Sequence, residues 1–173
     1  MLWLKAFRSV AVVGVLWLPA TAVAQPSIPI PDDTVITLQR GNCDVVQCPV
    51  YRVLIFANRD VIWQGRGRVA NLGVVLSQIE WNKIRELIQD FESIDYFHLE
   101  DIYGFHGSGC RSSAPYMPVV ITSLSMGGRS KTVSHHDGCV GDVSEKLTAL
   151  ENSIDKAVDA THWITGKPPA PRQ

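Results

Sequence analysis

Three consecutive residues, His135, His136 and Asp137, carry the side chains best suited to metal binding. Imidazole nitrogens and carboxylate oxygens are ligands that zinc and copper accept. His106 lies in a glycine-rich segment and completes the set of candidate metal ligands. Adjacent residues on a strand point to opposite faces, however, so His135 and His136 are poorly placed to share one ion. An exposed strand end beside a turn is the alternative interpretation of this cluster.

Four cysteines form the second group with distinctive chemistry. An even number of cysteines in an exported chain favours disulfides over free thiols or metal ligation. We predict the pairs Cys43–Cys48 and Cys110–Cys139, because each pair lies at the ends of a local segment. The second link would tether His106 to the segment that holds the other candidate metal ligands.

Thiol–disulfide exchange at Cys43 and Cys48 is an alternative interpretation of the first pair. A catalytic dithiol usually has the spacing Cys-x-x-Cys at a helix N-terminus, where the helix dipole lowers the pKa of the attacking thiol. Here the gap is longer, and Cys48-Pro49-Val50-Tyr51 leads into a strand-like segment. The same spacing disfavours a four-cysteine zinc site.

The serines and carboxylates do not predict a catalytic residue. The sequence has no Gly-x-Ser-x-Gly elbow between a strand and a helix, which is the setting of a serine nucleophile in hydrolases. Glu100 and Asp101 fall in a predicted loop, where acidic side chains are usually solvated. The glycines at 65–73 lack the Lys-Ser/Thr of a phosphate-binding loop. We therefore expect a protein that is not an enzyme and that uses no cofactor.

Hydrophobic periodicity predicts the elements of the first half of the domain. Alternating or β-rich segments predict strands at 34–40, 50–56 and 61–64, with a hairpin turn at 58–60 and a further short strand at 68–70. Ser77 and Glu80 have the spacing of a capping box at a helix start. The following residues recur at the three- and four-residue spacing of one buried helix face: Trp81, Ile84, Leu87, Ile88 and Phe91.

The second half contains a predicted hairpin and a predicted helix. Segments 115–126 and 129–135 flank the turn pair Gly127-Gly128, and a helix is expected to start near Asp142 or Ser144. Trp163 would dock the end of that helix. The order of elements predicts an α+β fold, with a mainly antiparallel sheet built from hairpins and two helices packed on one face.

The N-terminal residues predict export. Lys5 and Arg8 precede a short apolar run at 10–18, and Ala22-Val23-Ala24 supplies the small residues of a signal-peptidase site. The run is about half of the roughly 20 residues that span a bilayer, so an uncleaved anchor is the less favoured alternative. We expect a signal peptide at 1–24, a flexible segment at 25–33, a single α+β domain at 34–164 and a flexible Pro-rich tail at 165–173. The expected location is periplasmic or secreted.

The charge balance of the exported chain excludes some classes of partner. Removal of residues 1–24 takes away two basic residues and no acidic one, so the formal net charge of −1 becomes −3. Nucleic-acid binding needs a basic surface that displaces counterions. We therefore expect no nucleic acid and no membrane partner after cleavage.

Several short motifs resemble a bacterial family of exported domains whose function is unknown. The most specific one is Cys43 followed by Cys48-Pro49-Val50-Tyr51, after the strand end Leu38-Gln39-Arg40. Lys131-Thr132-Val133 with a following His and Gly, and the helix segment 150–155 before Trp163, complete the resemblance. The resemblance implies one domain over roughly residues 34–164 and implies no activity.

These observations predict a non-enzymatic, disulfide-stabilised module that binds an unknown protein or small ligand. The alternative is a metal-binding protein that uses His106, His135, His136 and Asp137. A third interpretation is thiol–disulfide exchange at Cys43 and Cys48.

Overall fold

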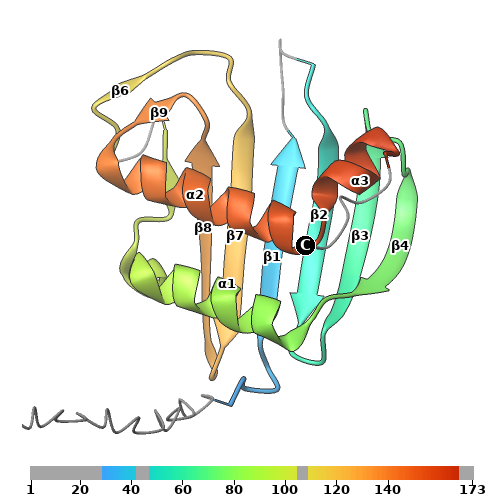
Figure 1. The fold of residues 1–173 in the computed structure, drawn as a ribbon. Helices are drawn as coiled ribbons and strands as arrows, with labels where there is room; N and C mark the ends of the chain where they lie inside the picture. The colour runs from blue at the N-terminus through green and yellow to red at the C-terminus, as the bar shows by residue number, and fades with distance from the viewer. Residues whose placement is uncertain (1–28, 42–46, 105–108, 168–173) are drawn as a thin grey trace, which may run out of the picture.

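The computed structural model describes residues 29–41, 47–104 and 109–167 (Figure 1). The predicted signal peptide, Cys43 and His106 lie outside these ranges. Among the described residues, no helix is both long and apolar enough to cross a membrane.

A seven-stranded sheet in the order β4-β3-β2-β1-β7-β8-β5 forms the centre of the domain (Figure 1). The neighbouring strands are antiparallel, except that β5 is parallel to β8. Its strands are β1 Val35–Gly41, β2 Val50–Phe56, β3 Asp60–Gly67, β4 Gly73–Gln78, β5 Ile102–Tyr103, β7 Val119–Met126 and β8 Arg129–His136. Two short strands, β6 Ser112–Ser113 and β9 Cys139–Val140, pair separately.

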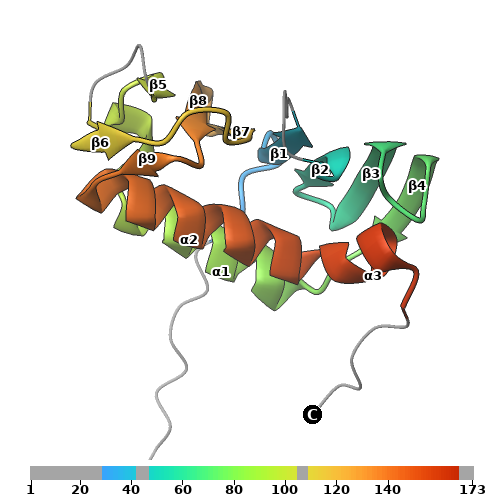
Figure 2. The same ribbon diagram turned by 90° about the horizontal axis from the view of Figure 1, so that it is seen from above.

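Three α-helices lie on one face of this sheet, and the opposite face, called the open face below, carries none of the described helices (Figure 2). They are α1 Trp81–Ser93, α2 Asp142–Ala157 and α3 Ala160–Thr165, with a short 3-10 helix, η1, at Tyr96–His98. The predicted α+β fold with an antiparallel sheet and helices on one face is therefore confirmed, and α3 adds a third helix.

Alternation along the strands explains the single helix layer. In β2, Tyr51, Val53 and Ile55 are buried, and the residues between them are only partly covered. Tyr51 stacks on Trp63 of β3, with ring centroids 4.5 Å apart, so β2 and β3 present aromatic side chains to the helices. In β2 and β3 one face is therefore buried and the other is only partly covered, which requires helices on one side only.

The predicted strand at 68–70 and the predicted capping box were both wrong. Ser77 and Gln78 belong to β4, which runs along β3 from the Gly73–Gly65 pair to the Gln78–Asp60 pair. Glu80 is the N-cap residue of α1 and makes no side-chain capping hydrogen bond. Cross-strand pairing with β3, which includes a 2.8 Å hydrogen bond from Gln78 to Asp60, therefore prevailed over the local helix-start signal.

Trp81 was predicted on the buried face of the helix and is 45% exposed instead. The core side of α1 consists of Ile84, Leu87 and Phe91, as the periodicity indicated. Trp81 occupies the first helical position, and the Arg59 guanidinium lies 5.9 Å from its ring centroid. Its large apolar surface is therefore available on the outside of the domain.

Asp33 connects the start of β1 to the β7–β8 turn. Its carboxylate accepts hydrogen bonds from the backbone N–H groups of Gly127 at 2.9 Å and Gly128 at 2.7 Å. Both glycines have positive φ angles, so neither position suits a residue with a Cβ. These hydrogen bonds, the one from Gly128 first, hold the pKa of Asp33 below its ordinary value of 3.8.

We predict that Asp33→Asn removes a pH-dependent part of the folding stability. A lowered folded-state pKa means that the carboxylate stabilises the fold above the unfolded-state pKa, and that this contribution is lost as the pH falls through the folded-state pKa. The difference in unfolding free energy between wild type and variant should therefore shrink on acidification, as measured by urea titrations at a series of pH values. Asp32→Asn, a neighbouring change at a residue that makes no hydrogen bond to this turn, is the control. A pH-independent difference for Asp33→Asn would contradict the assignment.

Candidate functional site

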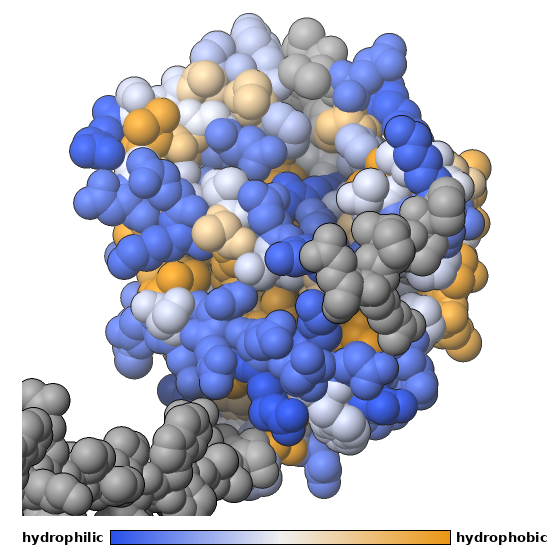
Figure 3. Space-filling view, in the orientation of Figure 1, coloured by the Kyte–Doolittle hydropathy of each residue, from blue (hydrophilic) through white to orange (hydrophobic). Residues whose placement is uncertain are grey.

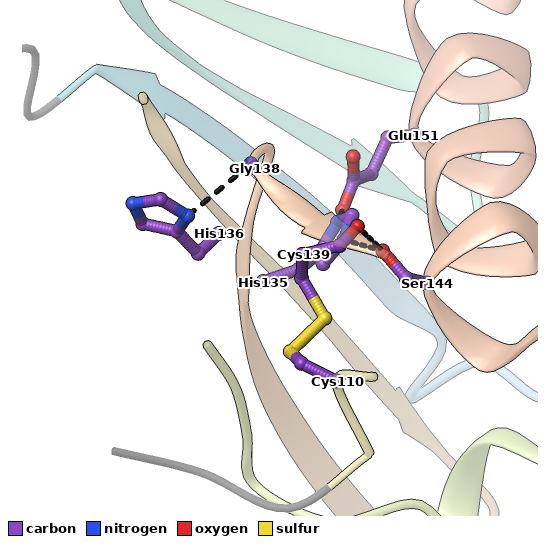
Figure 4. Close-up of a disulfide and its surroundings, with 7 residues drawn as sticks. All are labelled: Cys110, His135, His136, Gly138, Cys139, Ser144 and Glu151. Atoms are coloured by element: carbon purple, nitrogen blue, oxygen red, sulfur yellow. Dashed lines mark hydrogen bonds and ion pairs between the residues drawn. A yellow bond between two sulfur atoms is a disulfide. The ribbon is translucent and has the colours of Figure 1, made fainter. Parts of the chain in front are cut away.

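A disulfide between Cys110 and Cys139 ties the segment before β6 to strand β9 (Figure 4). Their Cα atoms are 5.3 Å apart and 29 positions separate them in the sequence, so the predicted pair is confirmed. Cys48 is also disulfide-bonded, but Cys43 lies outside the described residues, and the predicted Cys43–Cys48 pair stays a prediction. None of the described cysteines is a free thiol.

His135 lies at the centre of a buried polar network beside this disulfide (Figure 4). Its Nδ1 is 2.9 Å from Glu151 Oε1, and its Nε2 is 2.6 Å from Ser144 Oγ. The side chains of His135, Ser144 and Glu151 are at most 2% exposed. Strand β8 supplies the histidine and helix α2 supplies both partners, so the network connects the sheet to the helix layer.

The direction of the hydrogen bonds shows that Ser144 is not an activated nucleophile. The Ser144 hydroxyl donates its proton to the backbone carbonyl of Cys139 at 2.7 Å, and a carbonyl oxygen can only accept. His135 Nε2 must therefore carry a hydrogen and donate to Ser144 Oγ. A general base would need the opposite arrangement, with an unprotonated ring nitrogen accepting from the serine.

Among the described residues that are buried, Glu151 is the only Asp, Glu, Lys or Arg. One of its carboxylate oxygens has no hydrogen-bond partner. Oε1 contacts His135, whereas Oε2 is fully buried and has no hydrogen-bond partner. Burial raises the pKa of Glu151, and the hydrogen bond and charge of His135 oppose this increase. Asp137 is exposed, and its carboxylate lies within 4.8 Å of ligand atoms of both His135 and Glu151.

The structure therefore brings together two of the four predicted metal ligands, His135 and Asp137. His136 points away from them, as the alternation of a strand requires, and its Nδ1 accepts a 3.2 Å hydrogen bond from the Gly138 N–H (Figure 4). His106 lies outside the described residues. The third member of the cluster is Glu151, which the sequence analysis did not select.

A sequence signal for Glu151 was present. It lies four residues after Leu147 on the apolar face of α2, between Leu150 and Ile154 in the chain, and all four residues are buried. A carboxylate on a buried helix face must find a polar partner, because an unpaired buried charge is costly. The interrupted periodicity could therefore have identified Glu151 as a residue with a specific role.

A second polar cluster holds the C-terminal part of α2 against the sheet. Asp155 accepts hydrogen bonds from Arg40 Nε and from the Tyr51 hydroxyl, both at 2.7 Å. Arg40 also donates to Asn152 Oδ1 at 3.2 Å. Arg40 and Asp155 are each 20% exposed, and Tyr51 is buried.

Burial sets the electrostatics of this cluster. It raises the pKa of Asp155, while Arg40 and the Tyr51 hydroxyl lower it. Burial and the negative charge of Asp155 raise the pKa of Tyr51 far above its ordinary range. The hydroxyl is therefore a permanent donor to Asp155 at physiological pH. Three segments that carried the family resemblance, those ending at Arg40, Tyr51 and Asp155, thus meet at one place.

The edge strand β4 and Leu72, which lies just before it, present a row of exposed apolar side chains. Leu72, Val74 and Leu76 are 66%, 66% and 74% exposed. Val74 pairs with Gln64 and Leu76 with Ile62, so these residues lie on the open face, whereas Val75 pairs with the buried Trp63. Figure 3 shows hydrophobic surface along the right margin of the domain, where β4 lies in Figure 1. We call Leu72, Val74 and Leu76 the β4 row.

A pocket of about 750 Å³ adjoins the Gln78 end of β4. Its apolar lining includes Phe56, Ile62, Leu76 and Trp81. Leu76 belongs to both features, so the pocket continues the β4 row. Sequence analysis did not find this surface, because it placed Ser77 in a helix cap and Trp81 in the core.

Three arginines lie at the opposite end of β4. Arg52 is in register with Gln64, which pairs with Val74, and Arg66 follows Gly65, which pairs with Gly73. Arg66 and Arg68 are exposed. Within the described parts of the chain, none of the three arginines has a carboxylate within salt-bridge distance.

The fold and these contacts define a disulfide-linked α+β domain with one helix layer and one open sheet face. Residues 34–158 match the family described as Domain of unknown function (DUF6438). This match covers most of the chain, and the protein belongs to that family. A search of curated proteins found no match.

We predict that Tyr51 and Asp155 are energetically coupled. Asp155→Ala leaves the Tyr51 hydroxyl and the Arg40 guanidinium without their acceptor, and should cost about 1–3 kcal/mol of unfolding free energy. Tyr51→Phe removes one hydrogen bond and should cost about 0.5–1.5 kcal/mol. Because both changes remove the same contact, the double variant should lose less than the sum of the two.

Urea unfolding of the four members of this mutant cycle measures the coupling. Thr148→Ala, at an exposed position of the same helix, is the matched control and should be additive with Tyr51→Phe. Additivity of Asp155→Ala with Tyr51→Phe would contradict the assigned contact.

Proposed function

We propose that this protein is an exported, non-enzymatic interaction module that binds an extended segment of another polypeptide along β4. The observation that carries the proposal is the β4 row, which lies on the last strand of the sheet. In the sheet order β4 has β3 as its single neighbour. An edge strand of this kind can accept an added strand through backbone hydrogen bonds, with side-chain contacts supplying specificity.

The alternation of the β4 row specifies the apolar part of the partner. Val74 and Leu76 are two residues apart on the open face, so an added strand would place alternate side chains beside them. The pocket next to Leu76 would receive a further apolar side chain, and Trp81 would contribute a large aromatic contact. The partner segment therefore carries alternating apolar residues and one large apolar residue near the Gln78 end of β4.

The arginines specify the charge at the other end of the partner segment. Arg52, Arg66 and Arg68 form a positive group beside Gly73, and a domain with net negative charge has no general attraction for anions. An acidic side chain or a terminal carboxylate of the partner would complement this group. The occupant we propose is thus an extended segment that is acidic at one end and apolar at the other.

Two further features support a module of this kind outside the cytoplasm. The Cys110–Cys139 disulfide is typical of proteins in oxidising compartments, which agrees with the signal peptide proposed at residues 1–24. The Ser144–His135–Glu151 contact has hydrogen-bond directions that suit a structural role rather than nucleophilic catalysis. Neither feature depends on the proposed docking surface.

We predict that random peptides displayed on phage and selected on this protein will share alternating apolar residues with an acidic residue at one end. Leu76→Lys should weaken binding of a selected peptide by at least about tenfold, because it places a charge between two apolar surfaces. Leu76 is 74% exposed, so the variant should unfold at the same urea concentration as wild type. Isothermal titration with the synthetic peptide measures the change.

Thr132→Lys is the control, because Thr132 is an exposed residue of β8, which lies near the opposite edge of the sheet from β4. Equal weakening by both variants, or selected peptides without the predicted pattern, would count against the proposal. Self-association is tested separately by light scattering. A dimer that Leu76→Lys converts to monomer would identify a second copy of the chain as the occupant and overturn the proposal of a foreign partner.

A further inference from the structure

The cluster formed by His135, Asp137 and Glu151 combines ligand types that one ion can share. One nitrogen or oxygen atom from each residue lies within 4.8 Å of the corresponding atoms of the other two. The residues come from strand β8, from the turn after it and from helix α2. Their proximity is therefore produced by the packing of α2 on the sheet, and it does not depend on the proposed docking surface.

The second oxygen of Glu151 indicates that the cluster is incomplete. Oε2 is fully buried and has no hydrogen-bond partner, although a buried carboxylate oxygen normally accepts at least one hydrogen bond. Asp137 is the nearby acidic residue, and its charge adds to the negative potential at Glu151. A cation between the two carboxylates would satisfy the orphaned oxygen and relieve the repulsion.

The hydrogen positions on His135 allow a cation at Nδ1. Because Ser144 donates to the Cys139 carbonyl, His135 Nε2 carries a hydrogen, and Nδ1 is the nitrogen that faces Glu151 Oε1 at 2.9 Å. A bare ring nitrogen and a carboxylate oxygen both have only lone pairs to offer each other. A positive species must therefore lie between them, either a proton or a metal ion.

We propose that His135 Nδ1, one Glu151 oxygen and one Asp137 oxygen bind a single Zn²⁺ ion. Zinc accepts imidazole nitrogen together with carboxylate oxygen, whereas magnesium and calcium prefer oxygen ligands throughout. Three protein ligands leave a fourth position for water. Asp137 is exposed, so the ion can reach the site from solvent without opening of the core.

The surrounding contacts suit this assignment. Ligands of a tetrahedral zinc ion at about 2.0–2.1 Å lie about 3.3 Å from one another, and one ligand atom from each of the three residues already lies within 4.8 Å of the other two. The chain from Nε2 through Ser144 to the Cys139 carbonyl is the kind of outer contact that orients a metal-bound histidine. The disulfide of Cys139 in turn restrains the carbonyl that ends this chain.

Calorimetric titration of the full chain with ZnCl₂, after EDTA treatment with the disulfides intact, tests the proposal. We expect one zinc per chain and at least about tenfold weaker binding for Asp137→Asn, because one of three ligands is lost. Asp137 is an exposed residue, so the variant should retain the fold. Glu145→Gln, at an exposed acidic position of α2, is the matched control and should bind zinc like wild type.

His135→Gln and Glu151→Gln alter buried residues, so a spectroscopic measurement on the wild type replaces them. Zinc should shift the ¹⁵N resonance of His135 Nδ1 and leave Nε2 with its hydrogen. One zinc per chain, together with the shifted Nδ1 resonance and the retained Nε2 hydrogen, supports the site. Leu76→Lys should leave zinc binding and these two signals unchanged, because that variant tests a separate surface. Absence of zinc binding, equal affinity for Asp137→Asn, or tighter binding of Ca²⁺ than of Zn²⁺ would overturn the proposal.

Discussion

Helix α2 is fixed to the sheet by buried polar contacts at two points, and the rest of the domain depends on this attachment. Ser144 in its first turn and Glu151 in its middle contact His135 of β8, and near its end Asp155 binds Arg40 and Tyr51. Apolar contacts alone tolerate small shifts of a helix along a sheet, because the hydrophobic effect is non-directional. Hydrogen bonds to buried groups do not tolerate such shifts, because a misplaced partner leaves an unsatisfied polar atom.

This attachment also connects parts of the chain that are distant in sequence. The first contact point leads through Ser144 to the Cys139 carbonyl and hence to the disulfide with Cys110. The second point joins β1 and β2, where Tyr51 stacks on Trp63. The two halves of the seven-stranded sheet are therefore linked by one helix. The proposed zinc ion would strengthen the first of these points by pairing the orphaned oxygen of Glu151.

The three α-helices that the structure describes lie on one face, which leaves the other face and the β4 edge without a helix. When helices cover one face of a sheet, apolar and polar residues usually alternate along its strands. Strand β4 departs from that pattern, because its outward residues Val74 and Leu76 are apolar. Natural edge strands are usually protected by charge, proline or a covering segment. An unprotected apolar edge next to a pocket, with three arginines that have no carboxylate partner among the described residues, supports the proposal of a docking partner.

The sequence by itself determined the elements whose periodicity is strong and local. It predicted β2 at 50–56, the β7–β8 hairpin around Gly127-Gly128, the apolar face of α1, and the Cys110–Cys139 pair, because each follows from spacing within a short segment. Only the tertiary structure decided that Ser77 joins an edge strand, that Trp81 is exposed and that Glu151 meets His135. Those outcomes depend on which distant segment competes for a residue's hydrogen bonds or covers its side chain, and local spacing does not contain that information.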